Sequence, residues 1–396
     1  NNCLNFIWHA FHFPNDLPFR FSYMYSFILL VVGYKAISKI KSLEIRDITF
    51  VGILWVIFII LAQKMSTTKM METTIYTSIA FVIIWTGYLC LVRNGKADKL
   101  IASALAVLIC FSEVLIADTQ AILITQSNSS YKENYATYTE AIDKIKADDE
   151  GFFRQELCRL ETRMDPCYFG YSGMSTFSSM AYEDYSQLQY SLGMFGNRIN
   201  SYTYNTQTPV YNMMFNIKYL LQTDVSIAPS ENLYDYKFTT SDGKTNVYES
   251  KYFLPISFAV NENTELWDTT EGNPFDVQND FFELATGFSG VFKEVKYLDT
   301  KYDNVSGDKI SKNGTYWFSK YDADSSYAYA DITITPVKNG NIYLYVNSPD
   351  ISSIDISSTK LGSHTQNIDE PYILDCGYYE VGEELKLSID CGSADV

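Results

Sequence analysis

This chain of 396 residues has few histidines and lacks the sequence motifs of common hydrolases. The chain holds three histidines, and only His364 lies beyond residue 120. No pair of its seven cysteines has zinc-ligand spacing, so a zinc site of the usual His/Cys type has little to build on. Gly-x-Ser-x-Gly, His-Glu-x-x-His and phosphate-cradling glycine loops do not occur. These absences disfavour hydrolases and zinc enzymes.

Long apolar runs are what the first third of the chain does contain. A hydrocarbon core of about 30 Å needs roughly 20 helical residues, and four runs approach that length. They predict a partial α-helical transmembrane bundle of four spans, of which the second is short: Phe21 to Ser38, Ile48 to Ala62, Thr73 to Val92 and Lys99 to Ala117.

Charge predicts the orientation of these spans. The first and third connectors carry seven Lys and Arg and the second carries two, so the first and third are predicted to lie in the cytoplasm. Residues 1–20 and everything after Asp118 are then outside. Residues 1–119 hold 10 Lys and Arg against 7 Asp and Glu, whereas residues 120–396 hold 20 against 40. An outer part that acidic disfavours nucleic acid and anionic lipid headgroups as ligands.

The sequence predicts a partial transmembrane domain over 1–119. The outer part that follows is predicted to form two domains, an α+β domain over 120–286 and a β-sandwich over 287–396. Helical spacing predicts a helix over 133–149, and Asn273-Pro274 predicts the start of another. Asp242-Gly243 predicts a hairpin turn, and Asn339-Gly340 predicts a second turn between alternating strands. Two local disulfides, Cys158–Cys167 and Cys376–Cys391, are compatible with this compartment, and free buried thiols remain equally open.

Five short motifs, in order along the chain, resemble the YfhO family of bacterial membrane proteins. They are the loop and span from Trp8 to Ser26, Phe153-Arg154-Gln155-Glu156, Ser175-Thr176-Phe177-Ser178-Ser179, the strand Phe215 to Leu221, and Asn273-Pro274-Phe275-Asp276-Val277-Gln278-Asn279. Ala10 and Asp118 depart from the family pattern, which has Gly and Asn there. Because residues 1–20 are predicted to lie outside and the chain ends in a strand-like run, we expect a fragment lacking N-terminal spans and the C-terminal end.

The resemblance implies a multi-pass enzyme of the bacterial cell membrane, of the glycosyltransferase C type. Such an enzyme moves a sugar from a polyprenyl phosphate to an envelope polymer such as lipoteichoic or teichoic acid on the outer face. Its catalytic carboxylate is expected in a first outer loop that this chain does not contain. A divalent cation is left open as a cofactor. The alternative is a non-catalytic envelope protein whose outer domains bind polysaccharide or a protein partner.

Six residues form the predicted substrate-binding set: His9, Asn15, Asp16, Arg20, Glu113 and Asp118. The leaving phosphate needs a cation, for which Arg20 at the membrane surface is the candidate, although an interfacial anchor would look the same. His9 and Asp16 are candidates for hydroxyl contacts or proton transfer, with a structural role also open. Glu113 lies inside the fourth span, where a carboxylate is costly unless it has a polar partner.

A structural role is also open for Asp118, and it is favoured for Arg154 and Glu156. Asp118 lies near the outer interface, where it could simply cap the span. Arg154 and Glu156 share one face of a strand by its period of two, which predicts a structural ion pair rather than a ligand site.

Overall fold

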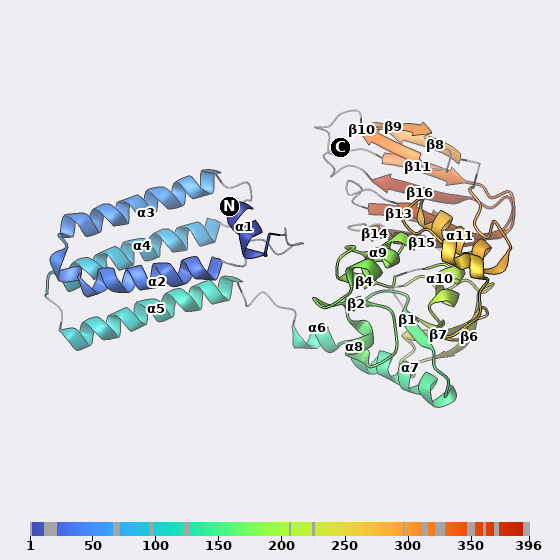
Figure 1. The fold of residues 1–396 in the computed structure, drawn as a ribbon, viewed down its shortest axis with the longest axis horizontal. Coiled ribbons are helices and arrows are strands. Elements are labelled where there is room, and N and C mark those ends of the chain that lie inside the picture. The colour runs from blue at the N-terminus through green and yellow to red at the C-terminus, as the bar shows by residue number, and fades with distance from the viewer. Residues whose placement is uncertain are drawn as a thin grey trace. The chain divides into compact units, whose positions relative to one another are not determined.

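The computed structural model (Figure 1) describes most of the chain, namely residues 2–11, 22–65, 72–95, 98–121, 127–205, 207–223, 226–295, 298–309, 316–320, 329–346, 353–358, 362–367 and 372–390. The chain divides into two compact units, Asn1–Tyr131 and Lys132–Val396. The predicted subdivision of the outer part at residue 286 stays a prediction.

The first unit is helical. Its elements are α1 (Asn2–Trp8), α2 (Ser22–Ser38), η1 (Ile40–Ser42), α3 (Ile45–Met65), α4 (Glu72–Arg93) and α5 (Lys99–Ala121). Apolar side chains cover nearly the whole circumference of α2 to α5 and remain exposed, as in helices that face lipid. The short helix α6 (Asn128–Lys132) contains the sequence boundary between the units.

Close packing joins α3 to α4 and α4 to α5. Gly52 on α3 faces Thr86 on α4, and a Cβ at Gly52 would lie 2.4 Å from the Thr86 hydroxyl oxygen. A small residue is therefore required for the two helices to approach. On the other side of α4, the Tyr88 hydroxyl donates to the Ala102 carbonyl of α5 at 3.0 Å.

Judged by length and composition, three described helices can cross a membrane: Ile45–Met65, Glu72–Arg93 and Lys99–Thr119. The predicted second, third and fourth spans are thus confirmed as candidate spans, and the second is longer than predicted. The helix of the predicted first span, Ser22–Ser38, is shorter, with 17 residues.

The second unit begins with mixed α and β structure. Its elements up to residue 286 are α7 (Tyr135–Asp148), β1 (Arg154–Leu157), α8 (Asp165–Phe169), β2 (Thr176–Phe177), α9 (Glu183–Ser191), β3 (Phe195–Gly196), β4 (Ser201–Thr203), α10 (Pro209–Met214), β5 (Ile217–Thr223), β6 (Tyr234–Thr239), β7 (Thr245–Ser250), η2 (Glu262–Leu266) and α11 (Pro274–Thr286).

Two small sheets organise this region. The four-stranded sheet has the order β1-β5-β7-β6, with β1 and β5 parallel, and the three-stranded sheet has the order β2-β4-β3. The apolar face of α7 is buried against the first sheet, so the predicted amphipathic helix is confirmed. The predicted turn at Asp242-Gly243 joins β6 to β7, and Gly243 has φ +74°. Asn273 caps α11 in a capping box with Asp276.

The last third of the unit consists of strands. They are β8 (Leu298–Asp303), β9 (Val305–Lys309), β10 (Tyr316–Lys320), β11 (Tyr329–Ile334), β12 (Gly340–Val346), β13 (Ser353–Ser358), β14 (Gly362–Asn367), β15 (Tyr372–Tyr379) and β16 (Leu385–Asp390). They form a five-stranded sheet, β14-β13-β16-β11-β8, and two pairs, β12-β15 and β10-β9. Side chains of β11, β12, β15 and β16 share one buried core. The strand-rich prediction is confirmed, and the β-sandwich as such stays a prediction.

The hairpin predicted around Asn339-Gly340 is wrong. β11 pairs with β16 and β8, whereas β12 pairs with β15. The chain therefore changes sheets at this turn. Apolar and polar residues alternate along both β11 and β12. This pattern fits two strands paired in one sheet and also two strands in different sheets, because every second side chain is buried in either case.

β15 also packs against the α+β part of the unit. The Ile373 amide donates to the Gly193 carbonyl at 2.9 Å, and the rings of Phe195 and Tyr372 meet edge to face at 5.6 Å. Gly193 has φ +85°, and a Cβ there would lie 2.6 Å from two side-chain atoms of Ile373. This junction therefore requires glycine for both conformation and space.

The local disulfide between Cys158 and Cys167 is not formed. Cys158 is a buried free thiol and Cys167 an exposed one, and Cys376 is also free and buried. Cys391 lies outside the described residues, so its predicted bridge to Cys376 is not described.

Candidate functional site

Half of the predicted substrate-binding set falls on described residues. His9 is half-buried just after α1, and Glu113 and Asp118 lie on α5. Asn15, Asp16 and Arg20 lie outside the described residues, so their roles stay predictions. Glu113 and Asp118 are five residues apart, which is about 140° around a helix, so α5 does not present both on one face.

Glu113 has a polar partner inside the apolar helices. The indole Nε1 of Trp85 on α4 donates to its carboxylate Oε2 at 2.8 Å, and both side chains are half-buried. This bond offsets part of the cost of placing a carboxyl group among apolar spans. Asp118 is exposed in the last turns of α5. Trp85 was not among the predicted residues, because nothing in the sequence links two positions 28 residues apart.

The ion pair predicted between Arg154 and Glu156 is wrong. Glu156 is 1% exposed and accepts hydrogen bonds from the Met174 and Ser175 amides, and from the hydroxyls of Ser175 (3.2 Å) and Tyr171 (3.3 Å). Burial raises the pKa of Glu156 to about 7. Its carboxyl group thus anchors the loop before β2 to strand β1, and Arg154 bonds elsewhere.

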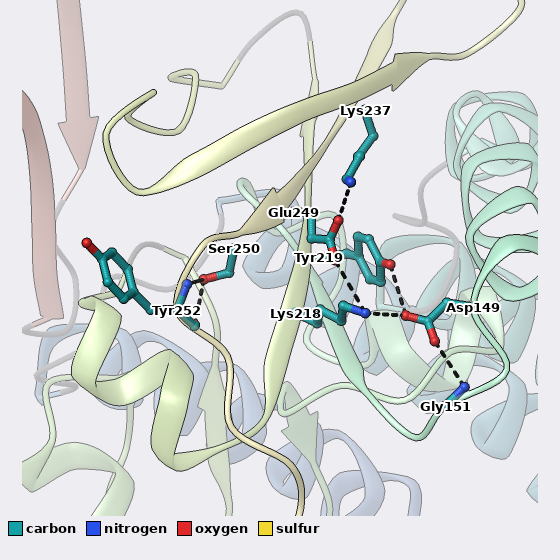
Figure 2. Close-up of polar contacts among 8 residues, drawn as sticks. All are labelled: Asp149, Gly151, Lys218, Tyr219, Lys237, Glu249, Ser250 and Tyr252. Atoms are coloured by element: carbon teal, nitrogen blue, oxygen red, sulfur yellow. Dashed lines mark hydrogen bonds and ion pairs between the residues drawn. The ribbon is translucent and has the colours of Figure 1, made fainter.

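Lys218 on β5 is the centre of a second polar cluster (Figure 2). Its Nζ lies 2.5 Å from an Asp149 oxygen and 3.3 Å from a Glu249 oxygen, and Lys237 pairs with the other Glu249 oxygen. The Tyr219 hydroxyl donates to Asp149 at 3.0 Å. The cluster ties the residue that follows α7 to strands β5, β6 and β7.

This Lys218 cluster is suited to structure rather than to proton transfer. Desolvation lowers the pKa of Lys218, but hydrogen bonds to Asp149 and Glu249 outweigh it and raise the pKa above its usual range. The hydrogen bond from Lys218 lowers the pKa of Asp149. Both groups therefore remain charged at neutral pH, and Lys218 cannot serve as a general base. The strand holding Lys218 carries a family-like motif, but its partners Asp149 and Glu249 had no sequence signal.

Metal binding finds no support in the described part of the chain. Among those residues there is no group of three or more His, Cys, Asp or Glu side chains that could hold an ion. Asp16, a predicted site residue with a carboxylate, lies outside the described residues, so a divalent cation stays a prediction.

The chain was compared with protein families, curated proteins and solved structures, and only the family comparison gave a match. No curated protein and no solved structure matches it. Residues 1–396 match the family described as bacterial membrane protein YfhO. This agrees with the five motifs, the candidate spans and the large region that follows them. The chain therefore belongs to the YfhO family of bacterial membrane proteins.

Proposed function

We propose that this membrane protein is a glycosyltransferase that uses a polyprenyl-phosphate sugar as donor. The acceptor hydroxyl, on an envelope polymer such as lipoteichoic or teichoic acid, attacks the anomeric carbon of the sugar. The bond from that carbon to the phosphate oxygen breaks, and the catalytic carboxylate that the family resemblance implies, distinct from Glu113, takes the hydroxyl proton. The observation that carries the proposal is a carboxyl group, Glu113, held by Trp85 between two candidate spans of a YfhO-family chain.

The proposed roles follow from charge and depth. Arg20 contacts the departing phosphate, because a guanidinium offers a fork of donors to phosphate oxygens. His9, Asn15 and Asp16 contact sugar or acceptor hydroxyls. Glu113, which accepts a hydrogen bond from Trp85, contacts the substrate from within the spans, and Asp118 contacts it at the outer interface.

We also propose that the unit after α5 lies outside the cell, as the connector charges predict. In intact cells, Lys338→Cys, at an exposed position between β11 and β12, should react with a membrane-impermeant thiol reagent. Lys41→Cys, exposed in the first connector, should react only after lysis. Both changes are made with the exposed native thiols Cys3, Cys110 and Cys167, and also Cys391, replaced by serine. The reverse labelling pattern would reject this orientation.

Arg20→Ala should lower envelope glycosylation about 100-fold or more at unchanged protein level, because the departing phosphate loses its cation. Arg20→Lys should restore only part of the activity. Glu113→Gln should impair transfer while keeping an oxygen for the Trp85 indole, so a loss here reports the charge rather than the helix contact. Wild-type glycosylation by both Arg20→Ala and Glu113→Gln would refute the proposed site.

The second candidate function is polysaccharide binding without catalysis. Exposed aromatic side chains on the second unit favour it, because sugar rings stack on such faces: Tyr182, Tyr236 and Tyr252. Incubation of the purified protein with a polyprenyl-phosphate sugar and acceptor separates the two functions. Transfer of the sugar supports the enzyme, and binding of the polymer with no transfer supports the alternative.

A further inference from the structure

Arginine is confined to one stretch of the acidic region. All four arginines of residues 120–396 lie between positions 154 and 198, and this stretch contains no lysine. Of its five carboxylic side chains, Glu156 and Asp165 are buried. The exposed charge here is thus close to balance, within a region that holds 40 acidic and 20 basic residues.

Arg154 is a half-buried cation whose contacts leave most of its donors unused. Its Nη1 donates to the Phe215 carbonyl at 2.8 Å, and its guanidinium lies 5.7 Å from the centre of the Phe152 ring. Within the described ranges, no carboxylate lies within ion-pairing distance of Arg154. A guanidinium has five N–H donors, and a partly buried charge without a counter-ion is costly. An anion bound at Arg154 would remove that cost.

Two tyrosines, Tyr185 and Tyr202, pack against the same buried cluster as Phe215, whose carbonyl accepts the hydrogen bond from Arg154. Tyr185 on α9 and Tyr202 on β4 meet edge to face, with ring centres 5.4 Å apart. Burial raises the pKa of both hydroxyls, that of Tyr202 to about 12, and the charge of Arg154 partly opposes this for each. Both hydroxyls are therefore protonated at neutral pH, and that of Tyr185 also interacts with Gln189.

Two other arginines of this stretch, Arg163 and Arg198, also contact aromatic rings. Arg163 donates to the Ser201 hydroxyl at 3.3 Å and lies over the Phe195 ring. The exposed Arg198 lies 3.8 Å over the ring of Tyr190 on α9. Aromatic rings thus contact both guanidinium groups, and the Ser201 hydroxyl also contacts that of Arg163.

We propose that Arg154, Tyr185 and Tyr202 form a binding site for a phosphate group carried by a flexible polymer chain. A guanidinium with two hydroxyl donors suits the several oxygens of a phosphodiester. A flexible chain can reach this site, whereas an anionic membrane surface would also meet the acidic remainder of the unit. The identification of this polymer as the acceptor rests on the proposed function. The binding of the polymer to the site does not depend on that function.

The test uses the full-length protein in detergent and a fluorescently labelled poly(glycerol phosphate) chain, with anisotropy as the readout. Arg154→Gln should raise the Kd about tenfold or more, since a charge-assisted bond is lost. Arg159→Gln is the matched control, because it makes the same charge change at an exposed position and should alter the Kd less than about twofold. An equal effect of both variants would overturn the site.

A second pair of variants keeps the test valid if Arg154→Gln disturbs folding. Tyr185→Phe and Tyr202→Phe keep the ring contact and remove the hydroxyls, and together they should weaken binding about tenfold. Unchanged binding in the double variant would contradict the proposal.

Three competitors identify the ligand. Displacement of the polymer by inorganic phosphate supports recognition of the phosphate group. Equal binding of a neutral glucan, or preferential binding of phosphatidylglycerol vesicles, would overturn the proposal. Loss of polymer binding in Arg154→Gln without loss of sugar transfer to a short acceptor would separate this site from the proposed catalytic one.

Discussion

Replacement of Glu156 by alanine is expected to lower the free energy of unfolding of the second unit by about 3–5 kcal/mol. The change leaves the buried amides of Met174 and Ser175 without an acceptor, at about 1–3 kcal/mol each, and also removes partners of two hydroxyls. Urea unfolding of the detergent-solubilised protein, followed by near-ultraviolet circular dichroism of its tyrosines, measures the loss. A decrease below about 1 kcal/mol would show that water takes over these bonds.

Glu156→Gln is the comparison variant. Its amide keeps an oxygen for the two backbone donors and has no charge, so the loss should stay within about 1 kcal/mol. The wild-type pKa is raised from 4.5 to about 7 in the folded protein. Between these values the folded state binds more protons than the unfolded state, so this group makes stability fall as pH rises from about 4.5 to 7. The glutamine variant should lack that slope, and identical slopes would contradict the assignment.

Gly193→Ala should lower the free energy of unfolding by about 2–5 kcal/mol. The positive φ of Gly193 alone costs a residue with a Cβ about 1–2 kcal/mol, and the clash with Ile373 adds about 1–3 kcal/mol. The control is Gly243→Ala, at φ +74° with nothing within 4 Å of the added Cβ, which should show the conformational cost alone. Urea unfolding of both variants isolates the clash. Equal losses would mean that β15 shifts freely away from the loop after α9.

Local signals in the sequence correctly predicted three features of the second unit. The 3.6-residue period gave α7, the Asp242-Gly243 turn gave the β6–β7 hairpin, and Asn273-Pro274 gave the start of α11. These features depend on neighbours within a few residues, which the sequence displays directly.

Contacts between distant segments were not predictable in the same way. The period of two correctly placed Arg154 and Glu156 on one strand, yet the backbone amides of Met174 and Ser175 bind the carboxylate. The course of that loop depends on packing that no local pattern encodes. Likewise, the approach of Tyr185 to Tyr202 depends on how α9 lies against β4.

The contact between Gly193 and Ile373 has a consequence for the order in which the protein is made. These residues are 180 positions apart, and at about 5–20 residues per second the ribosome needs roughly 10–40 s between them. During that interval the loop after α9 lacks the strand that covers it. The nascent chain therefore exposes apolar surface for times far longer than helix or hairpin formation takes.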